Sequence, residues 1–264
     1  MQYYLVFTAK KRDCKKRNTI LFYDGYNTLI IDPQLEAVDW IRQKINKFPV
    51  VGKMIILLSH EHDNHFTGLS RLLMDNPGII PILIFPESIA AMIDRQLMER
   101  VLPYKMTITD LLGIVKDQFY RKDELAGSFS PGTHGIHFII EPVSGHCRMM
   151  LQVSLVDAEK KKKFVFPSDN VTIGFPPPII KPGGSLTDIR RYYRKLLADM
   201  DEYDTCIIPG HGNVAGRDYI QILEQYFLAL PDLDWESVPG QMKDPALQEI
   251  GKIFHSINTQ LSQE

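Results

Sequence analysis

Short runs of apolar residues, many of them branched, recur along the chain and are bounded by Gly, Pro, Asn and Asp. Runs of this length and composition are typical of β-strands. The clearest are YYLVFT (3–8), TILFYD (19–24), NTLIIDP (27–33), KMIILLS (53–59), IPILIFP (80–86), HFIIEPV (137–143), MMLQVSLVD (149–157), KFVFPSD (163–169) and TCIIPG (205–210).

Between these runs the apolar residues are spaced by three and four positions. Leu35, Val38, Ile41 and Ile45 follow this spacing, as do the apolar residues of SLTDIRRYYRKLLADMDEY at 185–203. Such periodicity predicts amphipathic helices. Clusters of strands interrupted by helices indicate an α/β protein in which sheets are covered by helices.

The pattern changes after Ala229, where a Pro- and Gly-punctuated link precedes one more amphipathic segment. We therefore predict one domain over 1–229 and treat 230–264 as a C-terminal helical extension of that domain. Leu247, Ile250, Phe254 and Ile257 mark the apolar face expected for this last helix, and His255 is expected on its surface.

Charge and composition narrow the classes of partner. The 264 residues include 30 Lys and Arg against 32 Asp and Glu, which gives a formal net charge of −2. No broad basic field is present, so neither nucleic acid nor an anionic membrane is expected as a partner. The three cysteines are scattered and no apolar run approaches the ~20 residues of a membrane helix, which favours a cytoplasmic protein. We expect a small-molecule substrate, and the sequence is compatible with a homo-oligomer.

Side chains able to bind a metal stand just after several of the predicted strands. His60 and His62 follow MIILLS, His146 follows FIIEPVSG, Asp169 follows FVFPS, and His211 follows CIIPG. A single His or Asp in such a place is usually a loop or capping residue. Because strand ends on one edge of a sheet converge, the joint pattern predicts a shared site.

The segment HEHDNH (60–65) is the densest part of this pattern. In extended chain His60 and His62 point to the same side, so both imidazoles can bind one ion, and His65 begins the next helix facing the same way. Imidazoles with a nearby carboxylate suit Zn²⁺, and they also suit Fe or Mn. We therefore expect one or two metal ions here, with Zn²⁺ as the first candidate.

Taken together, HEHDNH with Gly68, GH at 145–146, SD at 168–169 and PGHG at 209–212 resemble the metallo-β-lactamase-fold superfamily of metallohydrolases. The opening strands that end in an Asp-containing turn are similar too. The resemblance implies a four-layer αβ/βα sandwich. It further implies that His60, His62 and His146 bind one metal, that His65 and His211 bind a second, and that Asp169 bridges both.

The function implied is metal-dependent hydrolysis of an ester-like bond by metal-bound hydroxide. Within the family, the glyoxalase II and lactonase branches are the most similar, which implies a thioester or lactone of a small acyl compound as substrate. A phosphodiesterase is the second alternative. Tyr120, in the long segment between 86 and 134, is a candidate for the wall of an apolar substrate pocket.

One position departs from the family pattern, because Asn64 stands where the family has Asp and the acid lies one residue earlier, at Asp63. A carboxamide is neutral, binds metal more weakly than a carboxylate and does not accept a proton near neutral pH. We therefore expect weaker binding of the second metal. Either Asp63 or Asn64 is also a good helix N-cap. The first alternative function is accordingly a metal-binding member with low or no catalytic activity that acts by binding a ligand or partner.

Overall fold

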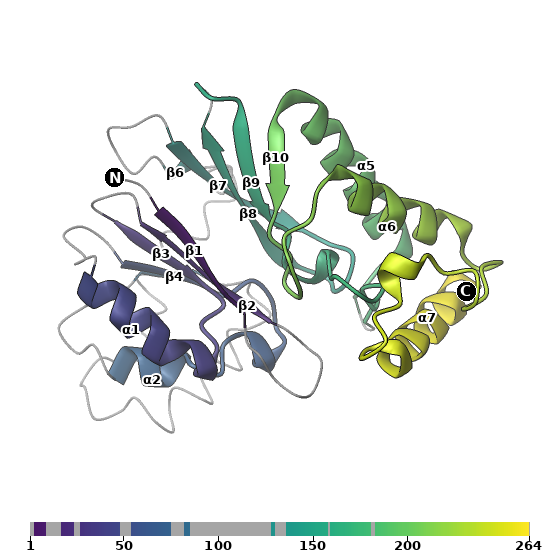
Figure 1. The fold of residues 1–264 in the computed structure, drawn as a ribbon, viewed down its shortest axis with the longest axis horizontal. Coiled ribbons are helices and arrows are strands. Elements are labelled where there is room, and N and C mark those ends of the chain that lie inside the picture. The colour runs from purple at the N-terminus through teal and green to yellow at the C-terminus, as the bar shows by residue number, and fades with distance from the viewer. Residues whose placement is uncertain are drawn as a thin grey trace. The chain divides into compact units, whose positions relative to one another are not determined.

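The computed structural model describes residues 3–8, 17–23, 27–47, 54–74, 82–84, 128–129, 136–157, 159–180 and 183–263. The chain divides into two compact units (Figure 1). Unit 1 comprises Met1–Ala9 and Arg17–Gly127, and unit 2 comprises Lys10–Lys16 and Ser128–Glu264. Each unit is built around its own sheet, and each is described separately below.

The sheet of unit 1 has five strands in the order of the chain. They are β1 (Tyr3–Thr8), β2 (Asn18–Tyr23), β3 (Thr28–Ile31), β4 (Met54–Leu57) and β5 (Ile82–Ile84). The pairs β1–β2 and β2–β3 are antiparallel, whereas β3–β4 and β4–β5 are parallel. Every residue of β3 and β4 is buried, as their continuous apolar sequences TLII and MIIL require.

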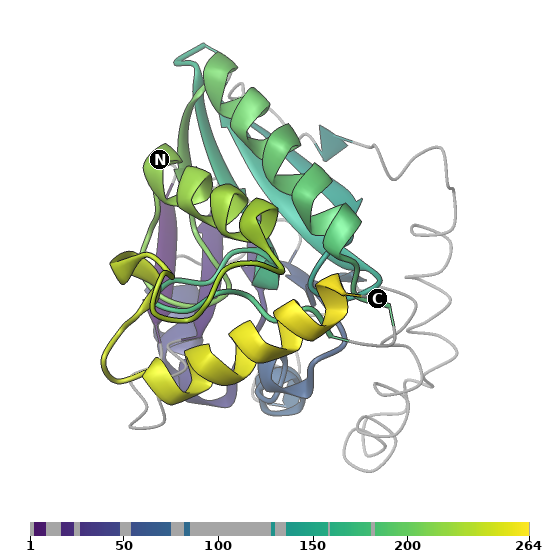
Figure 2. The ribbon, with the colours of Figure 1, turned by 90° about the vertical axis from the view of Figure 1, so that its right-hand side faces the viewer.

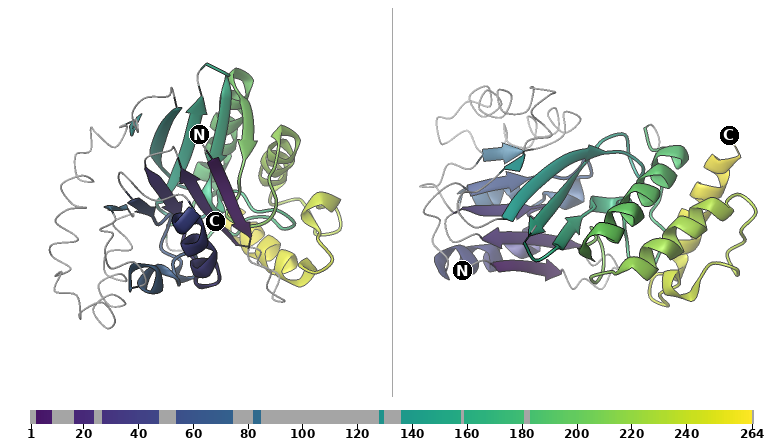
Figure 3. Two further views of the ribbon diagram at one scale, coloured as in Figure 1. Left: turned by 60° about the vertical axis from the view of Figure 1, so that its left-hand side comes forward. Right: turned by 90° about the horizontal axis from the view of Figure 1, so that it is seen from above.

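Two helical segments connect these strands. The first is η1 (Leu35–Ala37) with α1 (Val38–Lys47), and the second is η2 (Asp63–His65) with α2 (Leu69–Met74). Helix α1 buries the predicted apolar stripe through Val38, Ile41 and Ile45. Helices α1 and α2 lie on the same face of the sheet of unit 1 (Figures 1 and 3).

The sheet of unit 2 also has five strands, in the order β10-β9-β8-β7-β6. Their bounds are Ser128–Phe129 for β6, Ile136–Val143 for β7, Met150–Asp157 for β8, Lys162–Phe166 for β9 and Asp204–Ile207 for β10. The pairs β6–β7, β7–β8 and β8–β9 are antiparallel and β9–β10 is parallel. Strands β7, β9 and β10 therefore run in the same direction.

The helical elements of unit 2 are η5 (Ser168–Asn170), α5 (Leu186–Glu202), α6 (Arg217–Ala229), η6 (Gly240–Met242) and α7 (Gln248–Ser262). The sequence marks the start of α5, because the Ser185 side chain accepts a hydrogen bond from the Asp188 amide at 3.2 Å and so caps the helix. Helices α5 and α6 lie side by side next to the sheet of unit 2 (Figure 2). Tyr193 of α5 stacks on Phe227 of α6 in the core between them.

Helix α7 differs from its prediction in one respect. The buried residues within the helix are Gly251, His255 and Asn258. Of the predicted apolar residues, Leu247 is buried at the N-cap, whereas Ile250, Phe254 and Ile257 are only partly buried. The expectation that His255 lies on the helix surface is wrong, because its ring is buried and its Nδ1 lies 3.0 Å from the Tyr226 hydroxyl. A partner from another helix satisfies this polar ring, and the sequence pattern of α7 alone carries no sign of that partner.

None of the described helices is long and apolar enough to cross a membrane.

Candidate metal centre

Unit 1 places its polar side chains at the ends of two parallel strands. Asp32 follows β3, and Ser59 and His60 follow β4, so they leave the sheet at the same edge. Asp32 has a positive φ of 51°, which is uncommon for a residue with a side chain. Its backbone is held by bonds from the Asp32 amide to Leu57 O and from the Thr19 hydroxyl to Asp32 O.

The fully buried carboxylate of Asp32 organises this edge. Its Oδ1 accepts a hydrogen bond from the Ser59 amide at 2.7 Å, and its Oδ2 accepts one from the Ser59 hydroxyl at 2.6 Å. The same Oδ2 lies 2.9 Å from Nδ1 of His65. One carboxylate thus binds Ser59, directly before the HEHDNH motif, and His65, the last residue of the motif.

These contacts determine where the imidazole protons lie. Because a carboxylate only accepts hydrogen bonds, Nδ1 of His65 carries a proton. The Ser59 hydroxyl gives its proton to Asp32, so Nδ1 of His60, 3.0 Å from Ser59 Oγ, must be the donor in that pair. In both rings the lone pair is therefore on Nε2, the nitrogen that a metal requires.

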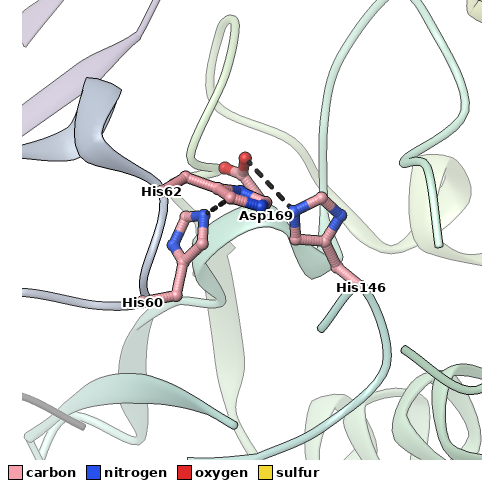
Figure 4. A group of neighbouring side chains, drawn as sticks. All are labelled: His60, His62, His146 and Asp169. Atoms are coloured by element: carbon pink, nitrogen blue, oxygen red, sulfur yellow. Dashed lines mark hydrogen bonds and ion pairs between the residues drawn. The ribbon is translucent and has the colours of Figure 1, made fainter. Parts of the chain in front are cut away.

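The two histidines of the H-x-H pair face one another. His60 Nε2 lies 2.9 Å from His62 Nδ1, as the dashed line between them marks in Figure 4. Two nitrogens bound to one ion at about 2.0–2.1 Å lie roughly 3 Å apart, so this separation suits two ligands of one metal. Asp32, His60 and His65 also offer one candidate ligand atom each, and these three atoms lie within 4.8 Å of one another.

Unit 2 gathers its candidates at the ends of three strands that run in the same direction. His146 follows β7, Asp169 lies in η5 directly after β9, and His211 follows β10. All three side chains are buried. His146 Nε2 lies 3.9 Å from Asp169 Oδ2, drawn in Figure 4, and His211 Nε2 lies 3.3 Å from the same oxygen.

His146 is fixed by its backbone and by its ring. The His146 amide donates to Asn170 Oδ1 at 2.9 Å, and Asn170 Nδ2 donates to Ser144 O at 3.2 Å, which ties this loop to the segment that carries Asp169. Nδ1 of His146 donates to the carbonyl of Pro178. A carbonyl only accepts, so His146 also has its lone pair on Nε2.

The Asp169 carboxylate occupies the space beside a glycine. A Cβ placed on Gly210 would lie 2.1 Å from Asp169 Oδ1, so only glycine lets the two segments approach this closely. Ser168, directly before Asp169, has a positive φ of 53°. The backbone directly before Asp169 is thus held in an uncommon conformation, as the backbone of Asp32 itself is in unit 1.

Two tyrosines, the fully buried Tyr193 and the partly buried Tyr219, hold the loops that follow these strands. Tyr193 donates to Asn170 O at 2.6 Å, and Tyr219 donates to Thr172 O at 2.9 Å while accepting from the Gly174 amide at 3.2 Å. Burial raises the pKa of both hydroxyls well above the usual value of 10.0, so they remain donors. Thr172 in turn forms a parallel bridge with His211.

The structure brings the candidate ligands together as two sets. His60, His62 and His65 lie together in unit 1, and His146, Asp169 and His211 lie together in unit 2. Asn64 is half-buried within η2, and its carbonyl accepts a bond from Arg17 Nη1 at 3.3 Å. Tyr120 lies outside the described residues.

Sequence reasoning missed two residues that hold these ligands, Asp32 and Asn170. Asp32 lies in the Asp-containing turn that ends the opening strands of the sequence. Its signal was the position after β3, since a carboxylate at the end of a buried strand needs polar partners. Asn170 directly follows a candidate ligand, and no motif in the sequence indicates its role.

The donor set of each unit fits a transition metal. Imidazole nitrogens with correctly placed lone pairs, supported by hydrogen-bonded Nδ1 protons, together with one carboxylate are ligands typical of zinc, iron and manganese sites.

No protein-family model matches the sequence, and no curated protein matches it. Solved structures do match. An archaeal metallo-β-lactamase superfamily protein from Sulfolobus tokodaii is 14% identical over 98% of this chain and 98% of that chain, with a TM-score of 0.60. A metallo-β-lactamase from Pontibacter korlensis is 13% identical over 86% of this chain and 94% of that chain, with a TM-score of 0.55.

The metallo-β-lactamase FIM-1 from Pseudomonas aeruginosa, in its mono-zinc form, is 16% identical over 90% of this chain and 92% of that chain, with a TM-score of 0.52. At identities this low, the structural similarity establishes the fold alone. It confirms the predicted class, α/β with two sheets and helices. The chain has the fold of the metallo-β-lactamase superfamily, as its histidine motifs predicted.

Proposed function

We propose that the protein is a metal-dependent hydrolase whose metal ligands are the histidines and the aspartate of the predicted motifs. In this proposal His60, His62 and His146 bind one ion, His65 and His211 bind a second, and Asp169 contacts both. The observation that carries it is the contact made by Nδ1 in three of the imidazole rings. His60, His65 and His146 each have Nδ1 occupied by a hydrogen bond to an oxygen, which puts the lone pair on Nε2.

When bound, a divalent metal lowers the pKa of water toward 7 and polarises the oxygen of the bond to be cleaved. The chain's own residues prepare the ligands for this ion. Asp32 accepts the Nδ1 proton of His65 and, through Ser59, fixes that of His60. Gly210 leaves room for the carboxylate of Asp169. Because these groups are buried and hydrogen-bonded, they need little rearrangement to bind the ion.

Zinc is the metal we propose, with iron and manganese as the alternatives that the same ligand types allow. A structural neighbour was solved in a mono-zinc form, which supports zinc for this fold. For the substrate we propose an ester-like bond in a small acyl compound, a thioester or a lactone. The net charge of −2 is unfavourable for a polyanionic nucleic acid substrate.

Asn64 favours a second candidate function, a metal-binding protein with little hydrolytic activity. If residue 64 is a ligand of the second ion, the carboxamide leaves that ion with one negative ligand fewer. We expect one ion bound tightly and the second weakly. The protein would then act by binding a ligand or partner through a mono-metal site.

Metal analysis of the purified protein, before and after incubation with Zn²⁺, tests the proposal. We expect about one equivalent retained through gel filtration, and a protein that retains no transition metal and takes none up contradicts the proposal. Asn64→Asp should bring the retained metal toward two equivalents and increase turnover of generic thioesters and lactones. Asn46→Asp, which adds the same charge at an exposed position of α1, is the matched control and should change neither quantity.

Activity in the wild-type protein separates the two candidates. Turnover that depends on added metal and is lost on chelation supports the hydrolase. Metal binding without turnover, together with turnover gained in Asn64→Asp, supports the low-activity candidate.

A further inference from the structure

The ring of His146 is oriented by a segment that has little secondary structure of its own. Nδ1 of His146 donates to the Pro178 carbonyl, and the Ile180 amide donates to His146 O at 2.7 Å. Pro178 belongs to the sequence FPPPII at 175–180, in which three successive prolines have no amide proton. Regular strand pairing cannot hold this segment, so its carbonyl positions depend on other contacts.

Those contacts come from Asn258 of helix α7. The Asn258 side chain is fully buried, its Oδ1 accepts from the Ile179 amide at 2.9 Å, and its Nδ2 donates to Pro177 O at 3.0 Å. The two bonds lie on either side of Pro178. The carboxamide therefore fixes the peptide unit that contains the Pro178 carbonyl, through the Ile179 amide, and the peptide unit before it, through the Pro177 carbonyl.

The position of Asn258 in α7 is fixed in turn. Its Nδ2 lies 3.5 Å from the Tyr226 hydroxyl, which is 3.0 Å from Nδ1 of His255 one turn earlier in the helix. A Cβ on Gly251 would lie 2.5 Å from the Trp235 ring, so α7 packs closely at its N-terminal end as well. The polar stripe of α7 is thus anchored to α6 and to the link before α7.

We propose that Asn258 is a positioning residue for the metal ligand His146. By fixing the Pro178 carbonyl, Asn258 keeps the proton of His146 on Nδ1 and its lone pair on Nε2, aimed at the metal. Helix α7, which carries none of the predicted ligands, then contributes to metal affinity. The inference rests on the proposed function in one respect only, that His146 is a ligand.

Two variants of Asn258 and one control test this. Asn258→Leu removes both bonds to the 177–179 segment at similar volume, and Asn258→Ser is a milder variant for use if the Leu variant does not fold. The control is Arg190→Gln. Arg190 makes three bonds to Phe227 O and Leu230 O, at 2.9, 2.7 and 3.2 Å, so it also secures backbone of unit 2 but does not contact the proline segment.

The first measurement is the ¹⁵N spectrum of the His146 ring in metal-free protein at pH 8, assigned with His146→Gln. The wild type and Arg190→Gln should have the Nδ1-protonated form. The Asn258 variants should have a mixture of the two neutral forms, since the acceptor that selects one of them is no longer held. This measurement does not require a metal, so it tests the positioning even if the proposed function fails.

The second measurement is Zn²⁺ affinity by competition with a chromophoric chelator. Loss of the group that supports a metal-ligating histidine typically weakens binding by about 10- to 100-fold. For Asn258→Leu we expect about tenfold, with Asn258→Ser between it and the wild type and Arg190→Gln within about twofold of the wild type. An unchanged His146 tautomer in folded Asn258 variants overturns the proposal, as does a loss of affinity in Arg190→Gln as large as in Asn258→Leu. Absence of Zn²⁺ binding by the wild type instead refutes the proposed function.

Discussion

Replacing one oxygen of Asp32 by nitrogen, in Asp32→Asn, should disable two histidines at once. The carboxylate accepts three hydrogen bonds, two from Ser59 and one from His65, at 2.6–2.9 Å. In the variant the amide oxygen must stay opposite the Ser59 backbone amide, because that donor cannot change. The new NH₂ group then points at the Ser59 hydroxyl and at Nδ1 of His65, which were both donors.

This conflict has two resolutions, and each leaves a measurable loss. If the protons stay where they are, two bonds to a charged group are lost, at about 1.5–3 kcal/mol each, and the free energy of unfolding falls by about 3–6 kcal/mol. If the protons move, His65 and His60 take the opposite tautomer, stability is largely kept, and Nε2 of each ring is protonated. Binding a metal then requires reversing both rings, each at a cost of about 10- to 100-fold in affinity.

The assay is urea denaturation together with Zn²⁺ competition on the same preparations. We expect either a stability loss of several kcal/mol or a fall in affinity between about 10²- and 10⁴-fold. Asp39→Asn is the matched control in the same unit, because Asp39 is 63% exposed and pairs with Arg71 on the surface, where ion pairs contribute less than about 1 kcal/mol. An Asp32→Asn protein with wild-type stability and affinity within threefold of the wild type would refute the reasoning.

Three further predictions concern unit 2 and the metal. Gly210→Ala should lower Zn²⁺ affinity by about 10²-fold, since a Cβ 2.1 Å from Asp169 Oδ1 must displace the carboxylate by about 1 Å; normal affinity in a competition assay would contradict this. Burial lowers the pKa of His255 below its usual 6.5, so the unfolded chain binds a proton that the folded chain does not. The free energy of unfolding should thus be highest above pH 6.5 and should fall as the pH drops from 6.5 through the lowered pKa of His255. Denaturation of His255→Gln across this pH range should lack this fall. Removing bound metal with a chelator should lower the melting temperature and restoring Zn²⁺ should raise it, as scanning calorimetry would detect; equal temperatures would count against a metal centre.

The sequence predicted those parts of the fold that depend on local pattern. Helix α5 has both an apolar stripe and a capping serine, Ser185, and the structure has the helix where the pattern predicts it. The strands before His60, His146, Asp169 and His211 could be read from their apolar runs. Their shared direction in each sheet could not, because strand order depends on contacts between distant segments.

The residues that hold the ligands in place are harder to predict from the sequence than the ligands themselves. A histidine motif has a recognisable spacing, whereas Asp32, Asn170 and Asn258 reach their partners through tertiary contacts that follow no period in the sequence. His255 illustrates the same limit. The pattern of α7 predicts this single histidine at the surface, and its burial depends on the hydroxyl of Tyr226 in another helix.

The dependence of the FPPPII segment on Asn258 also bears on biosynthesis. Domains fold as their sequence emerges from the ribosome, N-terminal parts first. All six predicted ligands are synthesised before α7, yet the two bonds on either side of Pro178 form only after residue 258 has emerged. A nascent or C-terminally truncated chain would hence carry a full set of ligands without a fixed His146, and we expect tight metal loading to follow synthesis of α7.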